Sequence, residues 1–185
     1  MVYIRKGVNK WERVEKELNR RSHPEKKVIM KETKVLKMDG TKAPIITHTF
    51  AADKGHYGSI WNIYIEAEDS DEDMDKIAVI VDQRGYGYYP TDWIVLKPQY
   101  RKFLLGYLQW NTFSSKASYL PDRTQIFLKV SIFDKAGNES NEVVFPFTFE
   151  SGVRSPYPRQ LPAPFDQGVI PRLGYIMIDL YGERI

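Results

Sequence analysis

The chain has 185 residues, of which 42% are hydrophobic and 14% aromatic, and it contains no cysteine. This composition excludes a chain that is disordered throughout, because aromatic and β-branched residues supply the apolar area that offsets chain entropy. The lack of cysteine excludes disulfides, thiolate metal ligands and cysteine nucleophiles. No apolar run approaches the ~20 residues that span a bilayer, and no secretory signal is recognisable. We therefore expect a cytoplasmic protein without membrane insertion.

The net charge of +3 hides an asymmetry between the two ends of the chain. Residues 1–42 hold thirteen Lys or Arg against six Asp or Glu, a net charge of +7, whereas residues 43–185 hold fourteen against eighteen, a net charge of −4. A basic block of this kind contributes to affinity only when it meets opposite charge. We therefore divide the chain into a basic N-terminal arm (1–42), a folded body (43–150) and a Pro-rich C-terminal arm (151–185).

The basic arm contains one predicted short helix, over residues 10–21. Asn9 is a favourable N-cap residue, and Trp11, Val14 and Leu18 share one face of such a helix. This stripe needs a surface to pack on, because isolated helices of fewer than ~12 to 15 residues are marginal in water. We predict that the arm binds a partner through its apolar and basic residues, which are Trp11, Val14, Leu18, Arg20, Arg21, Lys26 and Lys27.

From Ala43 onward, apolar and polar residues alternate, and Gly, Pro, Asp and Asn interrupt the alternation. This pattern is typical of antiparallel sheets packed face to face. Pro146 cannot donate a ladder hydrogen bond, so its strand is predicted at a sheet edge or at a bulge. Residues 99–109 fit either a strand or a helical turn. The predicted strands cover residues 45–50, 60–67, 76–82, 93–96, 103–110, 126–133 and 143–149.

The C-terminal arm holds five prolines between Gly152 and Pro171, followed by an apolar stretch over residues 173–180. Proline keeps the chain extended and so reduces the conformational entropy that is lost on docking. The apolar stretch is therefore predicted to be a strand that the extended Pro-rich segment delivers to a distant sheet edge. It pairs with an edge of its own body or with an edge of a partner, and its candidate contact residues are Tyr175, Ile176 and Ile178.

Two turns give the body its resemblance to a known family. An acidic turn joins the predicted strands within residues 65–77, and Asp134-Lys135-Ala136-Gly137-Asn138 forms a D-x-A-G-N hairpin. These passages resemble those of bacterial immunoglobulin-like and fibronectin type III-like modules. In the hairpin, Asp134 is able to bond back to the turn amides, and Gly137 tolerates a positive φ. The resemblance covers residues 43–150 and implies an immunoglobulin-like antiparallel β-sandwich that binds without catalysis.

The acidic turn also offers alternate carboxylates, which match the oxygen ligands that calcium prefers. The match to a helix-loop-helix calcium loop fails at two positions, because Met74 replaces the turn glycine and Ile80 replaces the bidentate glutamate. A solvated turn without a metal is therefore the preferred prediction, and calcium is the weaker alternative. The carboxylates of that alternative are Asp69, Asp71, Asp73 and Asp75.

An aromatic loop over residues 84–93 begins an insertion that exceeds the family's pattern. Tyrosine and tryptophan offer a large contact area at a low rotamer cost, and glycines let a partner approach the backbone. The loop is either a contact surface or a cluster that covers one open end of the sandwich. Its candidate contact residues are Tyr86, Tyr88, Tyr89 and Trp93.

The sequence contains no nucleophile elbow, phosphate-binding loop or dinucleotide-binding glycine pattern, so we predict a protein that is not an enzyme and uses no cofactor. The predicted function is that of a protein-binding or structural subunit of a larger assembly, whose arms contact homo- or hetero-subunits. Two alternatives stay open. One is a nucleic-acid or ribosome-associated protein, whose binding falls steeply with salt, and the other is an extracellular carbohydrate-binding module.

Overall fold

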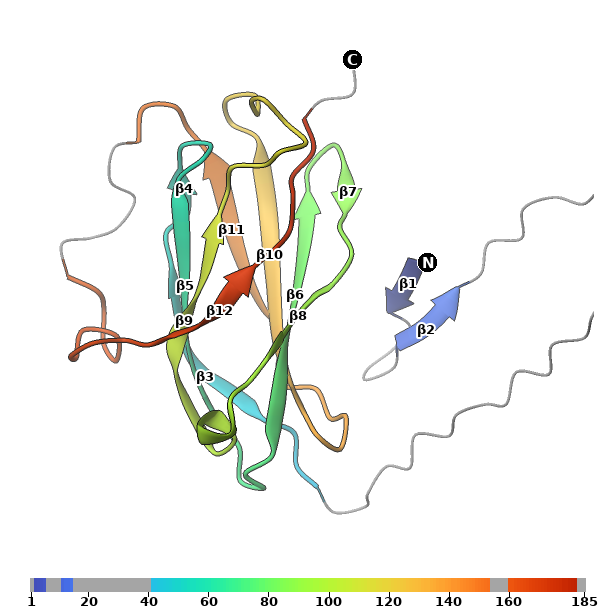
Figure 1. Ribbon diagram of the computed structural model, residues 1–185, viewed down its shortest axis with the longest axis vertical. Coiled ribbons are helices and arrows are strands. Elements are labelled where there is room, and N and C mark those ends of the chain that lie inside the picture. The colour runs from blue at the N-terminus through green and yellow to red at the C-terminus, as the bar shows by residue number, and fades with distance from the viewer. Residues whose placement is uncertain (1, 6–10, 15–40, 154–159, 183–185) are drawn as a thin grey trace, which may run out of the picture. The chain divides into compact units, whose positions relative to one another are not determined.

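The computed structural model describes residues 2–5, 11–14, 41–153 and 160–182. They belong to two compact units, one within residues 1–40 and one within residues 41–185. Both units are built from strands, and the only helical element in these ranges is the 3-10 turn η1 (Pro98–Tyr100). No helix of the described ranges has the length and apolar character that a bilayer span requires. The described part of the chain is therefore all-β (Figure 1).

The N-terminal unit contains a two-stranded antiparallel ladder in place of the predicted helix. Strand β1 (Val2–Arg5) pairs with β2 (Trp11–Val14). The prediction of a helix over residues 10–21 is therefore wrong where it covers β2, and its remaining residues lie outside the described ones. The spacing of charges and apolar residues favoured a helix, but a helix this short gains little from propensity, and aromatic and β-branched residues pair well between strands.

The body consists of two sheets with the core between them. The four-stranded sheet has the order β12-β9-β5-β3, in which β12 runs parallel to β9 and the other pairs are antiparallel. The prediction of a strand rather than a helical turn over residues 103–110 is confirmed. The strands of this sheet are β3 (Ile45–Ala51), β5 (Ile60–Glu68), β9 (Phe103–Asn111) and β12 (Arg172–Ile176).

The six-stranded sheet has the order β4-β11-β10-β6-β7, and β8 also pairs with β6. Strand β4 runs parallel to β11, and the other pairs are antiparallel. The predicted strands of the body are confirmed to within two residues at each end. The strands of this sheet are β4 (Lys54–Gly55), β6 (Met74–Gln83), β7 (Gly87–Tyr88), β8 (Asp92–Val95), β10 (Gln125–Asp134) and β11 (Val143–Phe149).

Alternate side chains of both sheets meet in one hydrophobic core. In β6, Ile77, Val79 and Val81 are fully buried, as period-two alternation predicts. Trp61 of β5 and Phe147 of β11 come from opposite sheets, and their ring centroids lie 4.4 Å apart. The core therefore joins the sheets into a sandwich, in agreement with the fold class that the sequence predicted at the level of an all-β, two-sheet architecture.

The C-terminal arm pairs with its own body, which is one of the two alternatives that the sequence left open. The packing of β12 depends on one glycine in β9, Gly106, and one in β12 itself, Gly174. A Cβ atom on Gly106 would lie 2.5 Å from the side chain of Leu173, and one on Gly174 would lie 2.5 Å from Ile94 Cγ2. Side chains larger than glycine therefore cannot occupy these positions without moving β12 or β8.

Hydrogen bonds extend this docking beyond the end of β12. Trp110 Nε1 donates to the carbonyl of Ile178 at 3.0 Å, and Ser114 Oγ donates to the carbonyl of Leu180 at 2.7 Å. Since Ile178 and Leu180 are themselves buried in the core, the segment after β12 closes the seam between the sheets on the side of β9 and β8 (Figure 1).

A side-chain clamp covers part of the outer edge of β3. Asn141 Oδ1 accepts a hydrogen bond from the Ile46 amide at 2.8 Å, and Asn141 Nδ2 donates to the Ile46 carbonyl at 3.1 Å. A register shift between Ile46 and His48 bulges the same strand. Strand β11 pairs with β4 only at its C-terminal end, and Pro146 lies in the remaining length, so its predicted edge position is confirmed.

The D-x-A-G-N turn between β10 and β11 has the geometry expected from its residues. Asp134 Oδ1 accepts a hydrogen bond from the Asn138 amide at 2.7 Å, and Gly137 has a φ of 87°. The local physical reason that supported the family resemblance is therefore confirmed.

Candidate functional site

The aromatic loop supplies side chains to two different surfaces. Tyr86 and Tyr89 lie at one end of the sandwich, beside Tyr181 of the C-terminal segment. Tyr88 and Trp93 instead lie on the outer face of the six-stranded sheet, because they pair with the outward positions Asp82 and Ala78 of β6. The predicted covering cluster is thus formed by Tyr86 and Tyr89, while a contact surface at Tyr88 and Trp93 stays a prediction.

The three tyrosines form a stack that closes the end of the sandwich. The ring of Tyr86 lies 4.9 Å from that of Tyr181 and 5.2 Å from that of Tyr89. Tyr89 OH donates to Gln83 Oε1 at 2.5 Å and accepts from the Tyr181 amide at 2.8 Å. Burial raises the pKa of Tyr89 to about 12. The stack is therefore a hydrogen-bonded structural cluster, and Tyr89 stays protonated at neutral pH.

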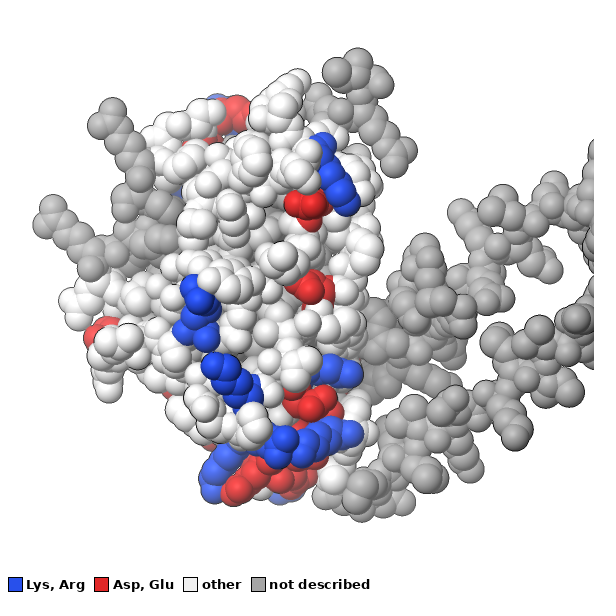
Figure 2. Space-filling view, in the orientation of Figure 1, with Lys and Arg blue, Asp and Glu red and all other residues white. Residues whose placement is uncertain are grey.

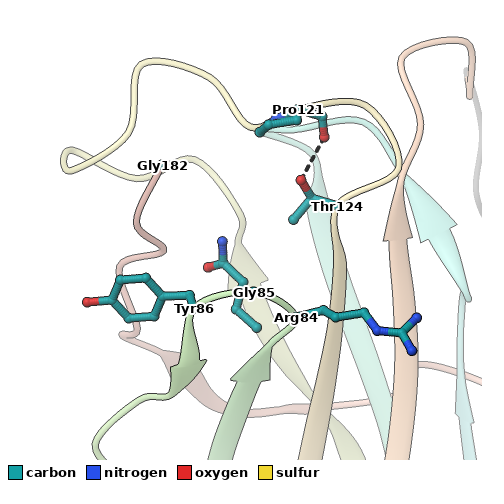
Figure 3. A pocket seen from close by; sticks show the side chains of 7 residues that line it. Arg84, Gly85, Tyr86, Pro121, Thr124 and Gly182 are labelled. Atoms are coloured by element: carbon teal, nitrogen blue, oxygen red, sulfur yellow. Dashed lines mark hydrogen bonds between the residues drawn. The ribbon is translucent and has the colours of Figure 1, made fainter. Parts of the chain in front are cut away.

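Two hollows of about 390 Å³ and 260 Å³ flank the tyrosine stack. The larger one lies between the Arg84-Gly85-Tyr86 turn and the Pro121 to Thr124 turn (Figure 3). Thr124 Oγ1 donates to the Pro121 carbonyl at 2.7 Å, and Arg84 Nη1 donates to Gln125 Oε1 at 2.6 Å. These polar groups already serve structural bonds, so we do not assign a ligand to the hollow.

The outer face of the six-stranded sheet carries apolar side chains where a solvent-facing sheet normally carries polar ones. Ala78 and Phe133 are buried on this face although they do not belong to the central core. Trp93 packs edge-on against Phe133, with 5.3 Å between the ring centroids. We call this surface the apolar face, and it comprises Ala78, Ile80, Tyr88, Trp93, Val95, Phe127, Phe133, Val144 and Pro146.

Four large side chains of the apolar face are open to solvent. The exposed fractions are 64% for Tyr88, 45% for Trp93, 73% for Val95 and 46% for Val144. They lie on β7, β8 and β11, and the smaller or more buried side chains of β6 and β10 lie between them. Large exposed apolar patches on soluble proteins are found at protein, membrane and ligand contacts.

The apolar face also carries two lysines whose ammonium groups lie over its aromatic rings. Lys76 Nζ lies 4.7 Å from the centre of the Trp93 ring, and Lys129 Nζ lies 5.4 Å from that of Tyr88. Glu142 is 3.9 Å from Lys129 Nζ. One of the two lysines is therefore paired with a carboxylate of its own chain.

Asp82 adds an opposite charge to the apolar face. In the ladder it lies between Tyr88 of β7 and Phe127 of β10. Within the described part of the chain, neither Lys76 nor Asp82 has a salt-bridge partner. Lys76 and Asp82 are therefore open to an ion pair with another molecule.

The acidic turn is a hydrogen-bonded structural turn. The two carboxylate oxygens of the buried Asp69 accept from the amides of Asp71 and Asp73, both at 3.1 Å. Asp71 Oδ2 accepts from the Lys42 amide. The described residues contain no group of three or more acidic or histidine side chains arranged to hold a metal. The calcium alternative, Asp69, Asp71, Asp73 and Asp75, thus has no support from the geometry of these residues.

The candidate contact residues of the C-terminal arm lie in different environments. Tyr175 is 51% exposed on the outer face of the four-stranded sheet, with the Arg172 guanidinium 4.2 Å from its ring centre. Ile176 and Ile178 are buried in the core of their own body. These two isoleucines were expected at a partner contact, but they pack inside the sandwich because β12 takes the intramolecular edge.

The candidate contact residues of the basic arm are not placed by the structure. Trp11 and Val14 belong to β2, whose backbone pairing alone is described. The other five, Leu18, Arg20, Arg21, Lys26 and Lys27, lie outside the described residues.

Sequence reasoning missed most of the apolar face, although β6 and β10 carried a signal for it. In β6 the run Ile77 to Val81 is apolar without interruption, where a half-exposed strand would alternate. In β10, Phe127 and Phe133 occupy outward-facing positions, where the alternation predicts polar residues. A count of apolar residues on both phases of each strand would have identified a sheet with two apolar faces.

Comparison with known proteins gives little further information. No protein-family model and no curated protein sequence matches the chain. Among solved structures, the chain is similar to a PKD domain of an M14-like peptidase from Thermoplasmatales archaeon SCGC AB-540-F20, at 14% sequence identity and a TM-score of 0.40. That match covers 60% of this chain and 99% of the other.

Proposed function

We propose that the protein is a non-enzymatic, protein-binding structural module that joins an assembly through its apolar face. The observation that carries the proposal is the exposure of Tyr88, Trp93, Val95 and Val144 together on one sheet face. Removing such side chains from water stabilises a complex by about 25 cal/mol per Å² of apolar area before the costs of association are subtracted.

The chemistry of the apolar face suits a protein partner. Aromatic residues are enriched at the centre of protein interfaces. Charged residues at the margin help to fix the orientation of the two partners. Trp93 has the properties of a binding hot spot, because it is large, half exposed and supported from below by Phe133.

The basic arm is proposed as a second contact of the same module. Its net charge of +7 over residues 1–42 suits an acidic patch on a neighbouring subunit. Contacts made by such an arm weaken as salt screens them, whereas the burial of apolar side chains is not screened by salt. The two contributions are therefore separable by ionic strength.

The test is the assembly state of the full-length protein purified from its source cells, measured by native mass spectrometry. We expect the wild-type chain in a complex and the Trp93→Ala variant released from it, with affinity lowered by about 30-fold or more, the effect of losing a hot-spot tryptophan.

Ile60→Ala is the matched control. Ile60 and Trp93 are both 45% exposed, but Ile60 lies on the four-stranded sheet. Equal loss of assembly in both variants would indicate general destabilisation, and unchanged assembly in Trp93→Ala would contradict the proposal.

A further inference from the structure

We infer that the partner of the apolar face is a second copy of this chain, stacked face to face with β6 antiparallel to its counterpart. This inference rests on the proposed function of that face and goes beyond it by naming the occupant. It follows from the arrangement of charge and side-chain size along β6.

Two of the three charged residues of β6, Lys76 and Asp82, are placed symmetrically. Lys76 and Asp82 point outward, and each lies three residues from Val79, so their Cα atoms are about 20 Å apart along the strand. A two-fold axis in the plane of the interface that crosses β6 at Val79 places Lys76 opposite Asp82 of the second copy, and Asp82 opposite Lys76. Because each copy supplies one Lys76 and one Asp82, the dimer contains two ion pairs, one on each side of the axis. The same chain thus supplies the counter-charges that neither residue finds in its own described part.

The apolar positions are complementary under the same operation. Ala78 falls opposite Ile80 of the second copy, so a small side chain meets a large one on both sides of the axis. In the neighbouring strands, Val95 pairs in the ladder with Lys76, and Tyr88 pairs with Asp82. The axis therefore brings Val95 opposite Tyr88, which joins two of the most exposed apolar side chains of the face.

Trp93, the largest side chain of the apolar face, also has a defined counterpart under this operation. On the side of β7 and β8, the ladder of β6 has partners at Lys76 to Val79 and again at Asp82 and Gln83, but none at Ile80 among the strand pairs. The axis brings Trp93 of one copy, which pairs with Ala78, opposite this unpaired row of the other copy. The chain continues past this row, since the Tyr89 amide donates to the Val81 carbonyl at 2.9 Å, so Trp93 packs onto the irregular segment that links β7 and β8 in the other copy.

The symmetry closes the assembly at two copies along this face. A two-fold contact uses the same surface on both chains, so it leaves no apolar face open for a third. The apolar face is smaller than the ~800 Å² per partner of a standard stable interface, because it spans about 20 Å along the strands and about 15 Å across them. We therefore expect a dimer whose population rises with concentration.

The experiment is sedimentation velocity of the full chain, from low micromolar to near millimolar concentration, with charge-reversal variants. Lys76→Asp and Asp82→Lys each place like charges opposite one another twice, and each is expected to raise the dimer dissociation constant by more than about tenfold. The double variant Lys76→Asp, Asp82→Lys restores opposite charges and is expected to dimerise like the wild type. Recovery in the double variant is specific to a second copy, because only a second copy carries the same two substitutions. A different protein would keep its original charges.

Glu68→Lys is the control, since Glu68 is an exposed charge at the end of β5 in the other sheet. Thermal unfolding of every variant checks that the fold is intact. A wild-type chain that stays monomeric over the whole range overturns the inference. A dimer that ignores both reversals, or a double variant that stays monomeric, overturns it as well.

The inference and the proposed function fail separately. If the wild-type chain is monomeric at all concentrations but Trp93→Ala is released from its native complex, the apolar face binds a different protein, and only the second copy is refuted. If Trp93→Ala leaves both the native complex and the dimer unchanged, the apolar face has no binding role.

Discussion

Asp73 is a carboxyl group that the fold holds in an unfavourable place. Burial, a hydrogen bond with the Asp69 side chain and repulsion from Asp134, Asp69 and Asp71 raise the pKa of Asp73 from 3.8 to about 6. Its Oδ1 atom is buried and has no hydrogen-bond partner within the described residues. Between these two pKa values the folded state binds more protons than the unfolded state, so the contribution of Asp73 to stability is lost as pH rises through about 6.

Replacing Asp73 by Asn should therefore stabilise the protein at neutral pH. The amide side chain carries no charge to repel Asp69 and Asp134, and it still donates a hydrogen bond to the Asp69 side chain. We expect Asp73→Asn to raise the free energy of unfolding by about 1 kcal/mol at pH 7, a value reduced for solvent screening, and to change it little at pH 4. Urea unfolding at both pH values measures the difference. Asp166→Asn, at an exposed position of the tail, is the control.

Tyr89 stabilises the end of the sandwich through both roles of its hydroxyl group. Tyr89→Phe keeps the stacked ring but leaves Gln83 Oε1 and the Tyr181 amide without this partner. We expect a loss of about 1–3 kcal/mol in the free energy of unfolding, the cost of leaving buried polar groups unpaired. Tyr88→Phe, where the ring is 64% exposed, should be close to neutral in the same urea titration. Equal effects of the two changes would contradict this role.

At the scale of the element, β12 depends on two positions that must be glycine. A methyl group at Gly106 would meet Leu173, and one at Gly174 would meet Ile94, each at 2.5 Å. We expect Gly106→Ala and Gly174→Ala each to cost about 1–3 kcal/mol through overpacking. Gly152→Ala adds a methyl group in open space and should stay within about 0.5 kcal/mol of wild type. Thermal unfolding ranks the three variants, and a neutral Gly106→Ala would show that β12 is loosely held.

The strands of the body could be predicted because their signal is local. Alternation in β5, β10 and β11 and the D-x-A-G-N turn follow from neighbouring residues, so their positions were correct to within two residues. The pairing of β12 with β9 and the seam filled by Ile178 could not be predicted, because intramolecular and intermolecular edges present the same hydrogen-bonding groups. The split of Tyr88 and Tyr89 onto different surfaces depends on β7, a strand of two residues that carries no readable period.

At the scale of the whole molecule, charge is unevenly distributed. On the visible surface of the body, charged side chains gather at the end that holds η1 and the β5–β6 turn, while the rest is largely uncharged (Figure 2). Without residues 1–40, the chain holds fifteen Lys or Arg against eighteen Asp or Glu, so the net charge changes from +3 to −3. The basic arm therefore sets the sign of the charge that an approaching partner meets.

Removal of residues 1–40 should leave the stability of the body nearly unchanged and weaken its electrostatic attraction to a partner. Residues 41–185 form their own compact unit, so we expect the truncated chain to unfold cooperatively, with a free energy within about 1 kcal/mol of the full chain. Retention of the truncated chain in the native complex should fall less with rising salt concentration than retention of the full chain. Circular dichroism during urea titration and native mass spectrometry at low and high salt test the two parts. A truncated chain that retains the full salt dependence would contradict the role of the arm.

The amide clamp on Ile46 has a consequence for how copies of this protein aggregate. Asn141 takes both main-chain groups that an incoming strand would need there, the bulge offsets the next ones, and Pro146 withholds a donor on the facing sheet. Polymers that grow by strand addition are therefore hindered at these parts of the β3 and β11 edges. If copies stack through the apolar face as proposed, the material formed in concentrated solution should redissolve on dilution instead of maturing into fibrils.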